Sequence, residues 1–373
     1  MRGLFLLAVG AIAPLAIACG PSKVQVSPAD VTRVDIRPAS GQALFCPGDP
    51  FQVELLVQTK GGGPCSSTDR ALGCMGKSDA VLDPSTVHVE AWPAQVVGGA
   101  DFTFSPDPNP LATAGTGVLL QGWLESAGQK SMVGKSTLKP VYACQAQQVI
   151  ARSGGLDWGS HGAAGPELHV FITTLSTPFY ANAALIRMEA PELGLVRYAI
   201  SPSADKPVTI VARGQDGAPG MPGALGQAGK KGSDGSGECS QGGRGGDGGP
   251  GGLGGPGGDG GPGAVVHLHA DAAASEALMA RVRITNPGGS AGHGGNGGVG
   301  GEPGAGGAAG PSGKSCFGKV GEPGTRGANG PAGPPGHPGA SGPTPTLDVA
   351  PRATLFPKEL STIMQVEATP APK

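Results

Sequence analysis

Aromatic and charged residues are both scarce in this 373-residue chain, at 4% and 14% of its composition. The 26 Lys and Arg residues form no cluster and nearly balance the 28 Asp and Glu, so the net charge is only −2. A nucleic-acid-binding protein needs a basic face and usually aromatic side chains, which makes nucleic acid a poor candidate partner. The absence of clustered aromatics also argues against a sugar-binding surface built on stacked rings.

The chain has no C-x₂-C pair among its seven cysteines and no histidine at ligand spacing near them, which disfavours a zinc centre. It also has little continuous apolar sequence. The one long apolar run, at 3–18, has 16 residues and follows Arg2. That length is short for a membrane span and typical of a signal peptide.

The end of this run predicts a lipid anchor. Ala16-Ile17-Ala18-Cys19 resembles a bacterial lipobox, although an ordinary signal peptidase could also cut after Ala18. If Cys19 carries lipid, six cysteines remain, an even number suited to an oxidising compartment. We therefore expect a signal peptide at 1–18 and a lipoprotein at the outer membrane or cell surface. The alternative is a secreted protein with a spare thiol.

The remainder predicts a mainly β fold with glycine-rich insertions. Short alternating runs separated by Pro, Gly and Asp indicate an immunoglobulin-like sandwich over 19–144. Similar runs continue through a second β domain at 145–352, with a short helix after Asp271 as its N-cap, and a tail follows at 353–373. Two glycine-rich arms, at 214–263 and 288–342, interrupt this second domain.

Each arm consists of two runs of glycine at every third residue, separated by a break with one cysteine. We call them run 1 (214–235), run 2 (242–263), run 3 (289–313) and run 4 (318–342). Such a sequence builds no hydrophobic core and favours the polyproline II helix, which has three residues per turn. Breaks this short cannot return the chain for a second parallel run, so each arm is predicted to be an antiparallel hairpin.

The glycine content of the runs predicts their order in a bundle. Runs 1 and 4 have one glycine per triplet, whereas run 2 and much of run 3 have two. Two glycines per turn leave two bare stripes, so runs 2 and 3 are predicted to be inner and runs 1 and 4 outer. Backbone N–H groups would then pair across the bundle. A trimeric collagen-like helix is the alternative that this pattern leaves open.

Three disulfides are predicted. Cys65–Cys74 would close a polar loop, and Cys46–Cys144 would join the start and end of the first β region. If the two arms pack side by side, their turns lie at one height, which predicts a Cys239–Cys316 disulfide.

Several short motifs resemble catalytic or ligand sites but lack the required surroundings. The segment 308–315, ending in Lys314 and Ser315, matches a loose phosphate-binding loop without its strand and helix. Gly288-Gly289-Ser290-Ala291-Gly292 matches a nucleophile elbow without the following helix. Residues 242–250 and 254–262 approach a calcium-binding nonapeptide but have glycine where an apolar residue is needed.

Two further groups of residues could form sites. His267 and His269 alternate on one strand face and could bind a metal, but no third ligand is evident, and a plain strand surface is the simpler interpretation. Residues 156–162 bring Asp157, Ser160 and His161 close together in sequence. Adjacency in sequence does not supply the geometry of a catalytic triad, so a polar loop is the simpler interpretation. No enzyme, cofactor, metal or nucleotide is therefore expected.

The repeats of runs 1 and 4 look like collagen. The layout as a whole resembles bacterial secreted collagen-like lipoproteins, such as those of myxobacteria, and the arms resemble the antiparallel polyproline II bundle of the snow-flea antifreeze protein. The resemblance covers 207–352 and concerns architecture.

The function expected is that of a non-catalytic, lipid-anchored surface protein, structural or adhesive, which presents a stiff rod. Its expected partners are the membrane, through Cys19, and an extracellular matrix or polysaccharide. The alternatives are a binding module for a repetitive ligand, either polysaccharide or ice, and a divergent hydrolase that uses 156–162.

Overall fold

The computed structural model describes residues 21–97 and 102–370. These residues confirm the predicted mainly β class. The chain divides into two units, Met1–Asp107 with Gly117–Pro140, and Pro108–Thr116 with Val141–Lys373. The second unit therefore begins near the boundary expected at 144/145 and also takes in a short segment from within the first region.

The first unit contains two five-stranded sheets, β2-β4-β9-β8 with β5 beside β4, and β11-β10-β12-β3 with β7 beside β10. β1 and β6 form a separate parallel pair. Its elements are β1 (Ser22–Val24), η1 (Pro28–Asp30), β2 (Val31–Pro38), β3 (Leu44–Phe45), β4 (Phe51–Thr59), β5 (Gly62–Ser66), β6 (Ala80–Leu82), η2 (Pro84–Thr86), β7 (Val87–Trp92), β8 (Ala94–Val96), β9 (Thr103–Pro106), β10 (Val118–Ser126), β11 (Gln129–Lys130) and β12 (Gly134–Pro140).

Alternation along the strands gives the first unit one core. In β2, Val34 and Ile36 are buried while Asp35 between them faces solvent, as expected for a strand with one covered face. These side chains join Leu55 of β4 and Leu120 of β10 in a single apolar cluster. Both five-stranded sheets thus contribute to the same core.

The second unit contains a three-stranded sheet, β13-β17-β19, and a five-stranded sheet, β16-β15-β14-β18-β20. Its elements are α1 (Leu111–Ala114), η3 (Ala143–Gln145), β13 (Gln147–Ile150), β14 (Leu168–Leu175), β15 (Ala183–Ala190), η4 (Pro191–Leu193), β16 (Leu195–Ser201), β17 (Val208–Ala212), β18 (Val266–Asp271), α2 (Ser275–Met279), β19 (Val282–Thr285), β20 (Thr346–Ala350), α3 (Arg352–Leu355) and α4 (Leu360–Ala368).

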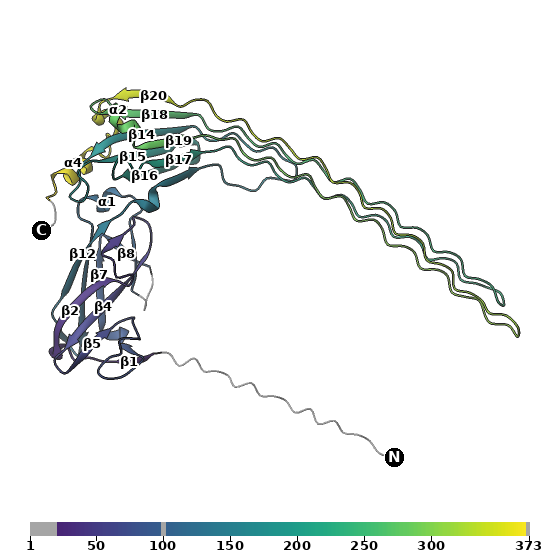
Figure 1. The fold of residues 1–373 in the computed structure, drawn as a ribbon, viewed down its shortest axis with the longest axis horizontal. Helices are drawn as coiled ribbons and strands as arrows, with labels where there is room; N and C mark the ends of the chain where they lie inside the picture. Colours follow the sequence, from purple (N-terminus) through teal and green to yellow (C-terminus); the bar gives the residue numbers. More distant parts are fainter. Residues whose placement is uncertain (1–20, 98–101, 371–373) are drawn as a thin grey trace, which may run out of the picture. The chain divides into compact units, whose positions relative to one another are not determined.

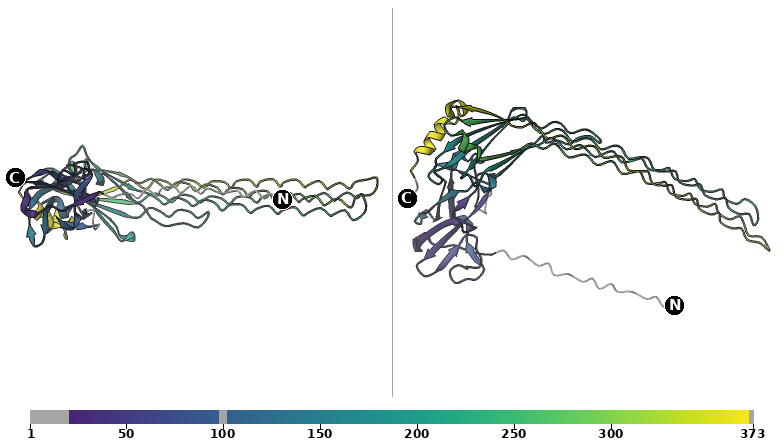
Figure 2. Two further views of the ribbon diagram at one scale, coloured as in Figure 1. Left: turned by 90° about the horizontal axis from the view of Figure 1, so that it is seen from below. Right: turned by 45° about the horizontal axis from the view of Figure 1, so that its top comes forward.

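Three connections cross from the smaller sheet to the larger one in the same way: β13 to β14, β17 to β18, and β19 to β20. β13, β17 and β19 are parallel to one another, as are β14, β18 and β20. Because parallel strands end at the same edge, all three connections leave from one edge of this unit. The second and third are the two long arms, which run side by side away from the strands (Figures 1 and 2).

The core of the second unit lies between its two sheets. Ile150, Ile210 and Val282 come from the three-stranded sheet, and Ile172 and Ile186 from the five-stranded one. All are at most 9% exposed. The glycine-rich arms contribute almost nothing to this cluster, so the apolar core ends where the arms begin.

The segment expected as a tail, 353–373, includes α4 and all of α3 except its first residue, Arg352. Leu355, Phe356, Ile363 and Val366 from these helices are buried with Leu185 and other residues in a second apolar cluster. The helices cover part of the outer face of the five-stranded sheet, opposite the core just described. The apolar spacing of Ile363 and Val366 is the helical signal within this segment.

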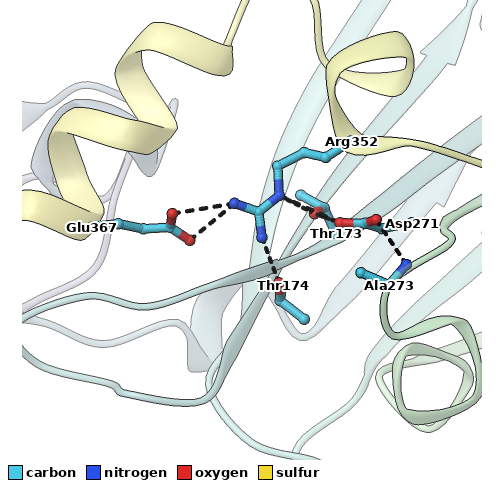
Figure 3. A network of polar contacts seen from close by, with 6 residues as sticks. All are labelled: Thr173, Thr174, Asp271, Ala273, Arg352 and Glu367. Carbon is cyan, nitrogen blue, oxygen red and sulfur yellow. Dashed lines mark hydrogen bonds and ion pairs between the residues drawn. The ribbon is translucent and has the colours of Figure 1, made fainter.

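Arg352 links the C-terminal helices to the sheet (Figure 3). Its guanidinium donates to Thr173 Oγ1 at 2.9 Å and Thr174 Oγ1 at 2.6 Å, and pairs with Asp271 at 3.3 Å and with Glu367 at 3.1 Å.

The predicted N-cap role of Asp271 was wrong, because this residue ends β18 and the helix begins later, at Ser275, after Ala274. The carboxylate is used instead to hold Arg352.

Candidate functional site: the glycine-rich arms

Glycine N–H groups join the four runs into one hydrogen-bonded lattice. Every third residue of run 1 donates to a carbonyl at or beside run 3, from Gly214→Pro287 to Gly235→Ala308, at 2.8–3.0 Å. Run 3 donates to run 2 with the same period, and run 4 to run 3, also at 2.8–3.0 Å. The residue numbers show runs 1 and 2 antiparallel, and likewise runs 3 and 4, as the predicted hairpins require.

Run 2 donates to two neighbours because it has two glycines per triplet. The first glycine of each pair bonds to run 4, beginning with Gly242→Lys319, and the second bonds to run 1, beginning with Gly243→Ser233. Runs 2 and 3 each bond to the three other runs, whereas no bond described between repeat glycines joins run 1 to run 4. The hydrogen bonds therefore follow the expected order, with runs 2 and 3 inner and runs 1 and 4 outer.

Glycine is required at the lattice positions because the backbones approach so closely. A Cβ atom added at Gly298 of run 3 would lie 1.8 Å from the carbonyl oxygen of Ala224, and one at Gly251 would lie 1.9 Å from that of Gly298. The second glycines of run 2 from Gly246 to Gly255 are less constrained: at Gly249, the nearest atom would be the Gln227 nitrogen at 3.2 Å. At Gly258 and Gly261, by contrast, an added Cβ would lie 1.9 Å from a carbonyl oxygen of the connection 151–167. The period of three is thus a steric requirement of the lattice.

Four aspartates stabilise the lattice further. Their carboxylates accept backbone N–H groups of residues that stand between the lattice glycines. Each carboxylate accepts from a residue of a neighbouring run at 2.6–2.7 Å, in the pairs Asp216–Ser290, Asp234–Ala308, Asp247–Thr325 and Asp259–His337. Three of them also pair with a basic residue three positions earlier, in the pairs Arg213–Asp216, Lys231–Asp234 and Arg244–Asp247. The predicted resemblance to a calcium nonapeptide involved Asp247 and Asp259, whose carboxylates are engaged in these contacts.

The aspartate contacts predict acid sensitivity of the arms. The backbone hydrogen bond is the main cause that lowers the pKa of Asp216, Asp247 and Asp259, and the Lys231 side chain is the main cause for Asp234. A depressed folded-state pKa means that the stabilisation is present above the unfolded value of about 3.9 and is lost as the pH falls through the folded value.

We therefore expect the thermal midpoint of the arms, followed by circular dichroism, to be flat from neutral pH down to about 5 and to fall below about 4. Replacing all four aspartates by asparagine keeps an acceptor oxygen and removes the charge, so the variant should lose this acid-dependent fall. An unchanged acid profile in the variant would show that other carboxylates cause it.

A third, shorter arm was missed in the sequence. The connection 151–167 lies against runs 1 and 2: Gly162 donates to Asp259 and Gly165 to Pro262, at 2.7 and 2.8 Å, and Ser160 accepts from Ala218. The signal was present, since Gly159, Gly162 and Gly165 keep the same period of three. The segment considered as a polar loop or hydrolase site is therefore part of the lattice, with His161 Nδ1 accepting the Asp259 N–H at 2.9 Å.

The turns of the two arms are joined by a disulfide between Cys239 and Cys316, with Cα atoms 5.6 Å apart. Lys314 and Ser315, from the apparent phosphate-binding loop, lie in this turn with neither a strand before them nor a helix after. Ser290, from the apparent nucleophile elbow, uses its carbonyl to accept from Gly217 within the lattice. The structural surroundings of both motifs are those of the repeat.

The other cysteines that were predicted to form disulfides lie outside the arms. Cys65 and Cys74 form a disulfide with Cα atoms 4.5 Å apart. Cys46 and Cys144 are each disulfide-bonded. The described residues contain three disulfides, which indicate an extracellular or otherwise oxidising environment. Cys19, the predicted lipidation site, lies outside the described residues.

A cluster of three histidines lies on the outer face of the five-stranded sheet. The sequence analysis identified two of them, His267 and His269. His169 on β14 is in register with His267 on β18, with ring centroids 5.0 Å apart, and its Nδ1 lies 3.2 Å from His269 Nε2. Burial, with a smaller contribution from the neighbouring His267, lowers the pKa of His169. Leu168, His169 and Val170 alternate between apolar and polar side chains, as do the residues around His267. This shared alternation is the sequence signal that could have indicated that the two strands are neighbours.

Comparison with protein-family models, curated proteins and solved structures gave no match. Among the described residues, none of the helices has the length and apolar character that a membrane crossing requires.

Proposed function

We propose that this chain is a lipid-anchored cell-surface protein, structural or adhesive, whose second unit presents a stiff polyproline II rod. The observation that carries the proposal is the lattice of glycine N–H bonds, which repeats every three residues across four runs. A three-residue period is that of the polyproline II helix, and no glycine of the four runs has a positive φ, in keeping with its φ of about −75°. The two sheets that share a core in the first unit support an immunoglobulin-like sandwich there.

The lattice favours a mechanical role over a chemical one. At a rise of 3.1 Å per residue, a run of eight triplets is roughly 75 Å long. The runs pair their backbone polar groups with one another, so the rod needs no apolar core to stay folded. Its far end is closed by the Cys239–Cys316 disulfide, and its near end continues into β17, β18, β19 and β20. Such a rod can hold its far end at a distance from the strands at its base.

The membrane anchor is tested by changing Cys19. In a Gram-negative host, globomycin should cause the unprocessed precursor to accumulate, and Cys19→Ser should release the protein from the membrane fraction. Membrane retention and normal cleavage of the Cys19→Ser protein would overturn the anchored part of the proposal.

The rod is tested on the released protein. Small-angle scattering and ultracentrifugation should find an elongated monomer, and a trimer would instead favour a collagen-like assembly. Adhesion of cells that display the chain should fall when the rod is disrupted by Gly298→Ala and persist with Gly249→Ala. Saturable binding of a polysaccharide or of ice by the soluble monomer would favour the binding-module alternative.

A further inference from the structure

We propose that the groove between runs 1 and 2 binds one polyproline II strand of another polypeptide, with glycine at every third residue of that strand. The short arm (151–167) fills this groove near the base of the rod and ends partway along it (Figure 2). The proposed site is the continuation of the groove toward the turn of the first long arm. It concerns the rod alone and is independent of the membrane anchor and of adhesion.

The short arm shows how the groove holds a strand of this kind. Gly162 donates its N–H to the carbonyl of Asp259 in run 2 at 2.7 Å, and the carbonyl of the next residue, Ala163, accepts from Gln215 of run 1 at 3.0 Å. The neighbouring bonds keep the period of three, in Gly165→Pro262 and Ala218→Ser160. Each triplet of the strand thus gives one donor to run 2 and one acceptor to run 1.

The same backbone groups continue along the groove beyond the short arm. Leu253 stands two triplets before Asp259 and Met221 two triplets after Gln215, so the register of the short arm carries over unchanged. Over the next four triplets, the groups that would meet a strand form no hydrogen bond with any described residue. They are the N–H groups of Met221, Ala224, Gln227 and Lys230 and the carbonyls of Leu253, Pro250, Asp247 and Arg244. Unpaired backbone groups in a fixed register are what an added strand uses at the edge of a sheet.

The second glycines of run 2 leave space for the carbonyl oxygens of such a strand. Under the short arm, Gly258 is buried, and a Cβ added there would lie 1.9 Å from the carbonyl oxygen of Ser160. Beyond the short arm, this position of the triplet is still glycine, from Gly246 to Gly255, but these glycines are only half-buried. No described atom would come closer than 2.9 Å to a Cβ added at any of them. The carbonyls of an added strand would lie over these glycines as that of Ser160 lies over Gly258.

The strand that fits this groove must itself have glycine at every third residue. A Cβ at Gly162 of the short arm would lie 1.9 Å from the carbonyl oxygen of Gln215, so the residue that donates to run 2 has no room for a side chain. The other two residues of each triplet need no N–H, and proline there favours the polyproline II conformation. Met221 and Leu253, which are 58% and 64% exposed, flank the first of the four triplets and favour apolar residues in the strand.

A single strand fits the groove better than a second copy of the rod. The repeat glycines of the outer runs already donate to the inner runs of their own bundle. Two folded rods would therefore have no exposed glycine stripe with which to fill each other's groove. A collagen triple helix likewise keeps its glycines at its axis. A single strand of four triplets would be about 37 Å long at a rise of 3.1 Å per residue.

The experiment is calorimetric titration of the peptide acetyl-(Gly-Pro-Ala)₄-amide, shown to be monomeric by ultracentrifugation, into the full chain. We expect saturable binding of one peptide per chain. In the amide spectrum of the ¹⁵N-labelled chain, the signals of the four N–H groups of run 1 that have no partner should shift and exchange more slowly with solvent. Those of Gly223 and Gly226, which already donate to run 3, should change little. The peptide acetyl-(Ala-Pro-Ala)₄-amide should not bind, because it has a methyl group at every glycine position.

Two matched variants locate the site. Gly249→Ala with Gly255→Ala places methyl groups where carbonyls of the strand would lie, at 3.2 and 3.1 Å from the nearest atoms of the chain itself, and should abolish binding. Leu225→Ala is the control, since Leu225 has the same place in its triplet as Asp216, whose carboxylate contacts run 3, and it should leave binding unchanged. Each variant is checked for a retained polyproline II melting curve.

Three results would overturn the proposal: absence of saturable binding at millimolar peptide, equal binding of the alanine peptide, or survival of binding in the double glycine variant. Self-association of the chain that the double glycine variant abolishes would also overturn it, and would assign the groove to a second copy of the chain.

Discussion

Loss of the Cys239–Cys316 disulfide is expected to lower the stability of the arms by about 4–5 kcal/mol. The bond joins residues 77 positions apart, and the chain-entropy model assigns this amount to a loop of that length. A small domain has a total stability of about 5–15 kcal/mol, so the change is large.

The arms depend on this bond because they gain little from burial of apolar surface. Each hydrogen bond of the lattice contributes only about 0.5–1.5 kcal/mol net, while glycine loses more conformational entropy on ordering than any other residue. The parallel strand pairs of the second unit already hold the arms together at their base. The disulfide closes the opposite end and removes much of the freedom that the unfolded arms would otherwise have.

The measurement is the melting curve of the polyproline II circular-dichroism signal for Cys239→Ser with Cys316→Ser. Its midpoint should fall clearly and should not depend on protein concentration. Cys65→Ser with Cys74→Ser is the matched control, since that disulfide closes a loop of sequence separation 9 in the first unit and should leave the arm signal in place. A concentration-dependent melt, or Cys239 linked between chains, would instead indicate a collagen-like trimer.

Substitution of a single lattice glycine is expected to have the second largest effect. Gly298→Ala would place a methyl group 1.8 Å from the Ala224 carbonyl oxygen, which belongs to the backbone of another run and cannot swing away. The runs must separate locally, and the loss of two or three lattice bonds corresponds to about 2–4 kcal/mol. The thermal midpoint of the arms should fall, and amide exchange near Gly252 and Gly330, the hydrogen-bond partners of Gly298, should accelerate.

Gly249→Ala is the matched control within the same bundle. A Cβ there meets its nearest neighbour at 3.2 Å, so a shift of a few tenths of an ångström accommodates it. Equal effects of the two substitutions would contradict the description of the lattice, because both replace a repeat glycine and differ chiefly in how closely a second backbone approaches.

The lattice of glycine hydrogen bonds could be predicted from the sequence, whereas the contacts of the four aspartates could not. The glycine period is local and strict, and it predicted extended runs, hairpins and the inner position of runs 2 and 3. The aspartate contacts depend on the relative height of neighbouring runs, as when Asp247 meets the Thr325 N–H. That height is set by the sheets and the turns, which the repeat itself does not specify.

Sequence alone determined the mainly β class and the course of the arms, because alternation and a three-residue period are properties of neighbouring residues. Only the tertiary structure decided that three arms leave one edge, since this follows from the parallel pairing of β13, β17 and β19. It also brought His169 and Glu167 to His267 and placed Phe356 of the expected tail in an apolar cluster. These contacts join residues far apart in the chain, and a local pattern holds no information on which distant strand or helix will supply the partner.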